Sequence, residues 1–322
     1  KDIVSTDTSW KSTMNGPYTA DDIYDGETYD AQKEENGWSS PGFDSSGWLK
    51  TKAATNSSIS TKINLDTVQL TAETEEPVEE TQEIRPVSVS NPSSGTYIFD
   101  LGQNIAGAAK ISVCGNAGTK VKIRYGEMLN SDGTLYTANL RTAKATDYYI
   151  LKGDAAGETY EPEFTYHGFR YIEITGYPGT LTQDNVTGVV FGSELTRTGD
   201  ISTSNTLVNQ LYSNIIWGQR GNFLSIPTDC PQRDERLGWT GDVQVFSRVS
   251  TLNYNVSSFL PEFVKNLGSE QYSNGEIEDA FPKAVYSAKN GSGWADAAII
   301  LPWTVYTAYG NRQVIYDNYN MM

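Results

Sequence analysis

The sequence contains few of the residues that build covalent or metal-bound frameworks. Two cysteines, Cys114 and Cys230, and a single histidine, His167, occur among 322 residues. Two cysteines do not make a disulfide framework, and one histidine does not provide a usual zinc site. We therefore expect no metal and no cofactor. Because His167 lies in a turn-like context, we expect it to be a packed structural residue rather than a base.

Basic charge and long hydrophobic runs are also scarce. The chain carries 24 Lys and Arg against 40 Asp and Glu, a formal net charge of −16, and its basic residues form no cluster. The average field therefore repels nucleic acid and anionic membranes. No apolar run approaches the roughly twenty residues of a membrane span. The composition, rich in Tyr, Thr, Ser and Gly, resembles that of many secreted bacterial β-rich proteins. This resemblance slightly favours a secreted or cell-surface location over the cytoplasm.

Hydrophobic periodicity divides the chain into a β-rich front and a helical back. Residues 1–70 are aromatic and turn-rich and predict short strands of a β-sandwich, with a turn rather than a calcium loop at residues 25–30. Residues 71–92 are acidic and punctuated by proline, which predicts a linker or an edge segment. Residues 93–198 alternate with period two, as in an antiparallel β-sandwich, and residues 199–322 change to helical spacing.

The helical back opens with a capped segment. Ser204 or Asn205 caps a helix that ends near Gly221 and carries two adjacent apolar stripes, so we expect this helix to be buried over a broad face. Further helical patterns occupy residues 243–249, 257–268 and 294–310. Strands that precede helices in this way are typical of separate β and α parts.

The densest chemistry lies between the first two of these helical patterns, in residues 226–242. These seventeen residues contain four carboxylates, two arginines, a tryptophan and two glycines. Proline, cysteine and glycine interrupt the helical spacing, which predicts a shaped loop at a functional site. The alternative is an Arg–carboxylate network that only ties two helices together.

The residue types in this segment suit the cleavage of a glycosidic bond. That reaction needs a carboxylic acid that protonates the leaving oxygen and a second carboxylate that activates water or attacks directly. Glu235, flanked by a carboxylate and two arginines, has the type of the first group. Asp229 and Asp242 offer acceptors for sugar hydroxyls. Arg233 offers a rigid fork of donors, and Trp239 offers a flat apolar face for a pyranose ring.

The string TDCPQRDERLGWTGD at residues 228–242 resembles the signature of the bacterial α-L-rhamnosidases of glycoside hydrolase family 78. Further matches are FDLGQN at residues 99–104, FTYHGFR at 164–170 and SGWAD at 292–296. Since DGETYD at residues 25–30 also looks like the family's N-terminal β-domain, the resemblance covers essentially the whole chain.

The resemblance implies an inverting hydrolase that removes terminal α-L-rhamnose from rhamnose-containing glycosides or polysaccharides by direct attack of water. By the family's motif Glu235 is the general acid, and the substrate contacts are Asp229, Arg233, Trp239, Asp242, Trp294 and Asp296. The implied domains are the C-terminal part of a carbohydrate-binding-like β-sandwich (1–70), a concanavalin-like sandwich (93–198) and the N-terminal portion of an (α/α)6 catalytic barrel (199–322).

The chain departs from the family pattern in its back half. The family's general base is a Glu in a later helical repeat that this sequence does not reach, and the helical signals after Gly199 number about four, too few for six hairpins. We therefore expect a fragment that carries the general-acid half only and is inactive alone. No spacing supports Glu276, Glu278 or Asp279 as a replacement base. An unfinished barrel exposes apolar helix faces, which predicts poor solubility or association through the missing half.

The sequence leaves two alternatives open. The aromatic front end suits a non-catalytic carbohydrate-binding protein, although the charged segment is richer than binding alone requires. Another glycosidase on the same (α/α)6 barrel shares the mechanism and differs in its sugar. Spacing fixes neither the aglycone and linkage nor the oligomeric state.

Overall fold

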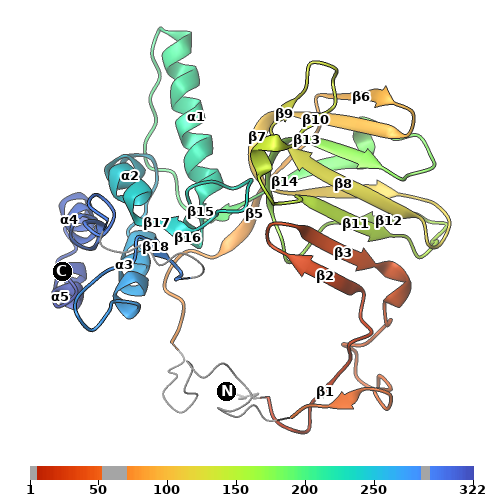
Figure 1. Ribbon diagram of the computed structural model, residues 1–322, viewed down its shortest axis with the longest axis horizontal. Helices are drawn as coiled ribbons and strands as arrows, with labels where there is room; N and C mark the ends of the chain where they lie inside the picture. Colours follow the sequence, from red (N-terminus) through yellow and green to blue (C-terminus); the bar gives the residue numbers. More distant parts are fainter. Residues whose placement is uncertain (1–5, 53–70, 284–290) are drawn as a thin grey trace.

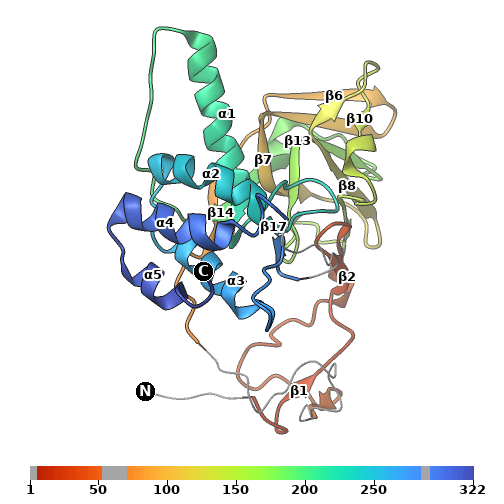
Figure 2. The same cartoon turned by 60° about the vertical axis from the view of Figure 1, so that its left-hand side comes forward.

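The computed structural model describes residues 6–52, 71–283 and 291–322. Within these residues the strands of a large sheet come first, and five α-helices follow. We call residues 18–30 and 78–193 the sheet region and residues 206–322 the helical region. Figure 1 shows the two regions side by side, and Figure 2 shows the same arrangement from a second direction.

The sheet region is built on one ten-stranded sheet. Its strands are β2 (Tyr18–Asp22), β3 (Gly26–Asp30), β5 (Val78–Ile84), β6 (Ser88–Ser93), β7 (Thr96–Val113), β8 (Lys120–Gly126), β11 (Thr146–Ile150), β12 (Glu158–Tyr160), β13 (His167–Thr175) and β14 (Val186–Ser193). They are ordered β2-β3-β11-β8-β13-β7-β14-β5, and β6 and β12 also pair with β7. Among the described residues, four short pairs lie outside this sheet: β1 (Lys11–Ser12) with β4 (Leu49–Lys50), β9 (Met128–Leu129) with β10 (Leu135–Tyr136), β15 (Phe223–Leu224) with β16 (Ile226–Pro227), and β17 (Gly238–Trp239) with β18 (Ala280–Phe281).

Strand β7 joins two sets of strands. Its first half pairs with β13 and β6, so that Ile98 lies opposite Glu173. Its second half pairs with β14 and β12, so that Ile111 lies opposite Val186. Apolar side chains from both sets, including Ile172 of β13 and Val186 of β14, meet in one buried core. A single long strand therefore holds the two sets around a common interior.

The core follows from alternation along the strands. Val121, Ile123 and Tyr125 of β8 are fully buried, whereas Lys122 and Arg124 between them are partly exposed. A strand points successive side chains to opposite faces, so a period of two in the sequence becomes a one-sided apolar surface. The alternation predicted for this segment is confirmed.

The hairpin β2–β3 lies within residues 1–70, for which a separate sandwich is predicted, and it extends the ten-stranded sheet. Strand β3 runs parallel to β11, and theirs is the single parallel pair among the described strands. Glu27 of β3 is buried, and its backbone N–H donates to Asp147 Oδ1 at 2.8 Å. Gly26 has a φ of 105°, and a Cβ there would lie 2.3 Å from the Thr146 carbonyl oxygen, so this close approach requires glycine.

Residues 71–92, predicted as a linker or an edge segment, contain two strands. Strand β5 pairs with β14 at the edge of the sheet, and β6 pairs with the first half of β7. The residues just before β5 contact the helical region, because Ser225 Oγ donates to Glu75 Oε1 at 3.0 Å and Ser258 Oγ donates to Glu76 Oε1. This acidic segment therefore bridges the sheet edge and the helices.

The helices are α1 (Thr206–Asn222), α2 (Thr240–Asn253), α3 (Phe259–Ser269), α4 (Ala297–Tyr309) and α5 (Gln313–Asn318). Asn205 caps α1 as predicted, since its Oδ1 accepts the backbone N–H of Leu207 at 2.9 Å. The prediction that α1 is buried over a broad face is wrong. Leu207 is 78% exposed and Leu211 is 59% exposed. Figure 1 shows the reason, because the first half of α1 projects beyond the other elements and only its last turns reach the sheet.

The helical region has its own core. Phe263 and Leu267 of α3 pack in one cluster with Leu301 and Val305 of α4. The helix α4 begins at Ala297, three residues after the predicted start, because residues 291–296 form a turn. No helix in the described ranges is long and apolar enough to cross a membrane.

Candidate active site

The charged segment forms a loop between two short strands. It leaves β16 (Ile226–Pro227) and returns through β17 (Gly238–Trp239), after which α2 begins at once. We call residues 228–237 the acid loop. The prediction of a shaped loop is confirmed, since these residues contain no helix and Arg236 has a φ of 51°.

Arg236 anchors the acid loop to the sheet region. Its side chain is buried, and Nη1 donates to the carbonyl oxygens of Ile23 and Tyr166, each at 2.6 Å. The guanidinium also lies over the Tyr24 and Tyr166 rings, 5.4 and 5.0 Å from their centroids. Burial lowers the pKa of Arg236, while the Tyr166, Cys230 and Tyr24 side chains oppose this shift. The loop is thereby attached to a rigid support.

Gly168 of β13 lets the acid loop pack closely against this strand. A Cβ on Gly168 would lie 2.8 Å from Pro231 Cγ and from Gln232 Cβ. The acid loop therefore rests directly on the strand backbone, and only glycine leaves room for it.

Two arginines hold the proposed acid, Glu235. Its Oε2 lies 2.8 Å from Arg233 Nη2 and 3.0 Å from Arg141 Nη1, and the Glu235 side chain is 19% exposed. The Tyr24 hydroxyl donates to the Glu235 carbonyl oxygen at 2.7 Å. Arg141 and Tyr24 belong to the sheet region and were not predicted. No spacing or motif in the sequence marks either of them as a neighbour of the acid loop.

Asp229 lies beside this pair. Its Oδ2 is 3.8 Å from Arg233 Nη2. Burial raises the pKa of Asp229, and the negative charges of Glu235 and Asp242 act in the same direction, while Cys230 opposes them. Burial likewise raises the pKa of the Cys230 thiol to about 11, so this thiol stays protonated at neutral pH.

Ligand-type atoms of Asp229, Cys230 and Glu235 lie within 4.8 Å of one another. Such a group has the donors for a metal ion, but the Arg233 guanidinium already reaches both carboxylates from this side. An arginine side chain neutralises neighbouring carboxylates without a metal. The arrangement fits an arginine-neutralised acid pair better than a cation site.

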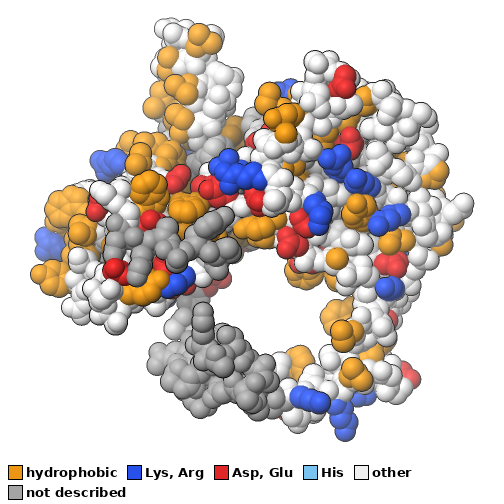
Figure 3. Space-filling model, in the orientation of Figure 1, with side chains coloured by type: hydrophobic (Ala, Val, Ile, Leu, Met, Phe, Trp, Pro, Cys, Tyr) orange, Lys and Arg blue, Asp and Glu red, His pale blue; other side chains and the backbone are white. Residues whose placement is uncertain are grey.

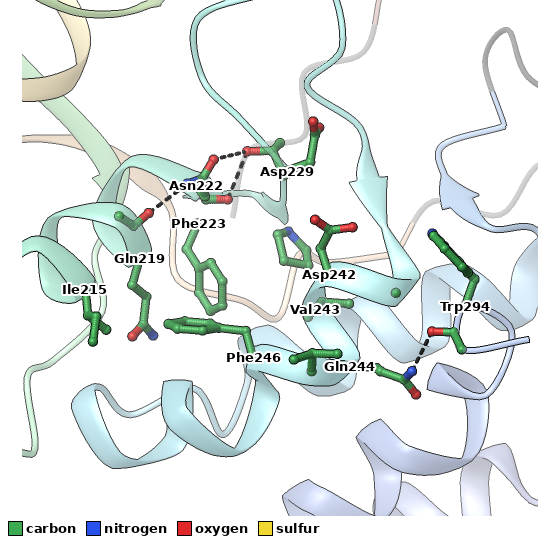
Figure 4. Close-up of a pocket in the computed structure, with 16 residues that line it drawn as sticks. Ile215, Gln219, Asn222, Phe223, Asp229, Asp242, Val243, Gln244, Phe246 and Trp294 are labelled. Carbon is green, nitrogen blue, oxygen red and sulfur yellow. Dashed lines mark hydrogen bonds between the residues drawn. The ribbon is translucent and has the colours of Figure 1, made fainter. Parts of the chain in front are cut away.

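A cavity of about 730 Å³ opens next to Asp229. It lies between α1, α2 and the turn at residues 291–296, and its lining includes Asp229, Asp242 and Trp294. Figure 4 shows Asp242 between the Phe223 ring and the Trp294 ring in this space. Burial raises the pKa of Asp242, and the charge of Glu235 adds to this. Carboxylates beside aromatic faces in a concave site suit a sugar ring.

Trp294 is fixed by its contacts with the start of α2. A Cβ on Gly241 would lie 2.9 Å from the Trp294 atoms Cε2 and Nε1, so the indole lies directly over this glycine. The amide of Gln244 donates to the Gly293 carbonyl oxygen and holds the adjacent turn, as Figure 4 shows. Trp294 therefore forms one wall of the cavity through its packing, not through a helix of its own.

The predicted site residues fall into two groups that share Asp229. Asp229, Arg233 and Glu235 form the charged cluster, and Asp229, Asp242 and Trp294 line the cavity. Trp239 lies outside that lining, in β17, where it pairs with Ala280 of β18 (Ala280–Phe281). Asp296 also lies outside it and accepts the Gly293 N–H at 3.2 Å.

The three carboxylates weighed as replacement bases are tied to other groups. Glu278 is buried and forms an ion pair with Lys283 at 2.9 Å. Asp279 is buried, and its Oδ1 accepts the Gly291 N–H at 2.9 Å. Glu276 lies in the same loop and does not line the cavity. These contacts indicate a structural role for the segment.

The lone histidine is structural, as predicted. His167 is fully buried, its Nε2 lies 3.2 Å from Asp147 Oδ1, and its ring stacks on Tyr125 with a centroid distance of 4.2 Å. It supports the sheet beneath Gly168 and the acid loop.

Three family models match consecutive parts of the chain. They are an α-L-rhamnosidase N-terminal domain (residues 1–82), a bacterial α-L-rhamnosidase concanavalin-like domain (90–192) and a bacterial α-L-rhamnosidase six-hairpin glycosidase domain (196–322). All three models describe domains of one group of glycoside hydrolases. The chain belongs to the bacterial α-L-rhamnosidase family.

Individual relatives agree with this assignment. An α-L-rhamnosidase of Formosa agariphila is 42% identical over 322 residues, which is 99% of this chain and 34% of the relative. The structure of an α-L-rhamnosidase from Dictyoglumus thermophilum matches with a TM-score of 0.93 and 40% identity, over 99% of this chain and 35% of the other. The Streptomyces avermitilis α-L-rhamnosidase complexed with L-rhamnose matches with a TM-score of 0.92 and 44% identity, over 99% and 30%. The chain thus spans about a third of the length of these relatives.

Proposed function

We propose that this chain supplies the general-acid side of a site that removes terminal α-L-rhamnose from glycosides. The observation that carries the proposal is the cluster of Glu235, Arg233 and Asp229 beside a cavity walled by Asp242 and Trp294. Cleavage needs a proton for the leaving oxygen, and Glu235 is the proposed donor, in a charged cluster that reaches the cavity through Asp229. The name of the Streptomyces avermitilis structure, which contains L-rhamnose, supports rhamnose as the sugar.

The roles of the other residues follow from their chemistry. Asp229 and Asp242 accept hydrogen bonds from sugar hydroxyls, and Arg233 donates its fork of N–H groups. Trp294 provides an apolar face for the ring. Trp239 and Asp296 lie outside the cavity lining, so their proposed contacts depend on the further extent of the substrate.

We further propose an inverting mechanism in which a carboxylate outside these 322 residues activates water. Inverting enzymes place acid and base roughly 6.5–9.5 Å apart, on opposite faces of the sugar. The helices α1–α5 are then the first helices of an (α/α)6 barrel, and the remaining hairpins carry the base. The 322-residue chain alone is inactive on this account.

Hydrolysis of an aryl α-L-rhamnoside tests both parts of the proposal. We expect no turnover above the buffer blank by the 322-residue chain. Robust turnover that disappears in Glu235→Gln would keep the acid assignment and overturn the external base. Robust turnover that survives Glu235→Gln would overturn the acid assignment.

Non-catalytic carbohydrate binding is a second candidate function, and a separate cavity favours it. This cavity, of about 870 Å³, is lined by the aromatic residues Tyr18, Tyr29, Trp38, Trp48 and Phe164. Trp38 and Phe164 are exposed, as in sites where sugars stack on aromatic rings. Rhamnose binding that depends on Trp38 and is unaffected by Glu235→Gln would favour this function.

A further inference from the structure

Arg141 reaches the acid loop from the sheet region. It follows the short 3-10 helix η3 (Ala138–Leu140) between β10 and β11, and its Nη1 lies 3.0 Å from Glu235 Oε2. The next residue, Thr142, donates from its backbone N–H to Asp234 Oδ2 at 3.2 Å, and its hydroxyl contacts the same oxygen. Two consecutive residues of the sheet region therefore bind two consecutive acids of the loop.

The conformation of Arg141 is imposed by its surroundings. Its φ is 58° and its ψ is −116°, a region that side-chain-bearing residues rarely adopt. Leu140 before it and Ala143 after it are buried, and the Ala143 N–H donates to the Leu140 carbonyl oxygen at 3.2 Å. The buried neighbours fix the backbone of this segment and so direct the guanidinium toward the acid loop.

The two oxygens of the Glu235 carboxyl group differ in their surroundings. Arg141 and Arg233 both approach Oε2, which is buried. Among the described residues, no ion pair or hydrogen bond reaches Oε1. Arginine only donates hydrogen bonds, so an oxygen that faces two guanidinium groups is a poor place for a proton. A protonated Glu235 therefore carries its proton on Oε1.

We propose that Arg141 is a positioning residue that the sheet region contributes to the active site. Together with Arg233 it holds Oε2 of Glu235 and directs the acidic proton to Oε1. The inference rests on the proposed role of Glu235 as the general acid. It adds that the sheet region takes part in setting the geometry and the charge of the acid.

The charged and titratable groups around Glu235 divide between the two regions. Arg233, Asp229, Cys230, Asp234 and Asp242 belong to the acid loop and α2, whereas the sheet region contributes Arg141 at the carboxyl group and the Tyr24 hydroxyl at the carbonyl oxygen. Arg141 can therefore be changed without altering the acid loop itself.

A carboxyl titration of the 322-residue chain tests the coupling without requiring activity. The chain is labelled with carboxyl-13C glutamate, and the signal lost in Glu235→Gln identifies Glu235. Removal of a nearby cation makes proton loss harder, so we expect Arg141→Ala to move the Glu235 titration midpoint upward by about one pH unit. Arg141→Gln, which keeps much of the side-chain length, serves as a second neutral variant with the same expectation.

Two further variants separate charge from loop attachment. Arg141→Lys keeps the charge and should leave the midpoint within about 0.3 unit of the parent chain. Thr142→Ala loosens the same attachment without changing charge and should move the midpoint less than half as far as Arg141→Ala. An unchanged midpoint in Arg141→Ala and Arg141→Gln would overturn the proposal, as would an equal shift in Thr142→Ala. Failure of the rhamnosidase assay, by contrast, leaves this result unaffected.

Discussion

The sheet region and the helical region differ in how completely they bury their apolar residues. The sheet encloses a core whose members include Phe99, Ile123 and Phe169, all without solvent exposure. The helices α1, α2 and α4 each bury one side and expose apolar residues, among them Leu211, Val245 and Trp303, on another. Figure 3 shows hydrophobic side chains on the surface of the helical region. We call the sheet region closed, because its core is enclosed, and the helical region open, because apolar helix faces remain exposed.

This difference explains where the acid loop is attached. Its anchors are the carbonyl oxygens of Ile23 and Tyr166, the Tyr24 hydroxyl, and the Arg141 and Thr142 side chains, all in the sheet region. A catalytic group needs rigid support to keep its geometry. The closed region supplies that support, and the open region supplies the cavity.

The largest expected effect is on the free energy of unfolding, when a leucine is shortened to alanine in each region. Leu151 is fully buried in the sheet core, whereas Leu211 of α1 is 59% exposed. We expect Leu151→Ala to lower the free energy of unfolding by about 3 kcal/mol and Leu211→Ala to change it by less than about 0.5 kcal/mol. Urea denaturation followed by tryptophan fluorescence measures both. Equal losses would remove the distinction between a closed and an open region.

The second-largest expected effect comes from removing Arg236, which attaches the acid loop to the sheet region. Arg236→Met leaves the carbonyl oxygens of Ile23 and Tyr166 buried without their donor, so we expect a loss of about 2–3 kcal/mol in the free energy of unfolding. The matched control, Arg248→Met, removes an exposed arginine of α2 and should stay within about 0.5 kcal/mol. If the two variants were equally stable, Arg236 would not anchor the loop.

A smaller effect comes from the glycine beneath the acid loop. The Cβ of Gly168→Ala would lie 2.9 Å from the backbone nitrogen of Gln232, so we expect a loss of about 1–2 kcal/mol and faster hydrogen exchange in residues 228–237. Gly218 of α1 has open space around its missing Cβ, and Gly218→Ala should stabilise the helix by up to about 1 kcal/mol. Unchanged exchange in Gly168→Ala would contradict close packing of the loop on β13.

The smallest effect is a pH dependence in the segment that bridges the regions. Burial raises the pKa of Glu75 from an ordinary value of 4.5 to about 7, while the hydrogen bond from Ser225 opposes the shift. The folded chain therefore holds this proton at a pH where the unfolded chain has released it. Its contribution to stability is complete below pH 4.5 and is lost as the pH rises through 7.

We therefore expect Glu75→Gln to flatten the fall in stability between about pH 5 and pH 7 by about 1 kcal/mol, a value discounted for the partial exposure of Glu75. Thermal unfolding at a series of pH values measures the slope. Glu79→Gln, at an exposed position of β5, is the control and should leave the slope as it is. The same slope in Glu75→Gln as in the parent chain would contradict a buried, protonated Glu75.

Much of the local structure could be predicted from the sequence. The alternation in residues 120–125 predicted strand β8, and Asn205 predicted the start of α1. Prolines and glycines at residues 226–242 predicted a loop. Each of these features depends on neighbours in sequence, so the local pattern carries the information.

Features that depend on distant segments could not be predicted. The apolar stripes of α1 predicted burial, but no described element covers Leu207 and Leu211. Parallel pairing of β3 with β11 joins strands far apart in the chain. Arg141 reached Glu235 through tertiary packing and not through a motif. Glu235 was proposed as the acid because the family signature contains it, whereas its partner from the sheet region, Arg141, carries no such signature.

The most direct test of the central claim follows the indole N–H signals of the 15N-labelled 322-residue chain during addition of L-rhamnose, with Trp→Phe variants for assignment. The account places the sugar in the cavity next to the acid loop, so the signal of Trp294 should shift with concentration while those of Trp38 and Trp48 stay in place. Shifts confined to Trp38 and Trp48 would contradict it, because the sugar would then bind the aromatic cavity and not the site next to Glu235.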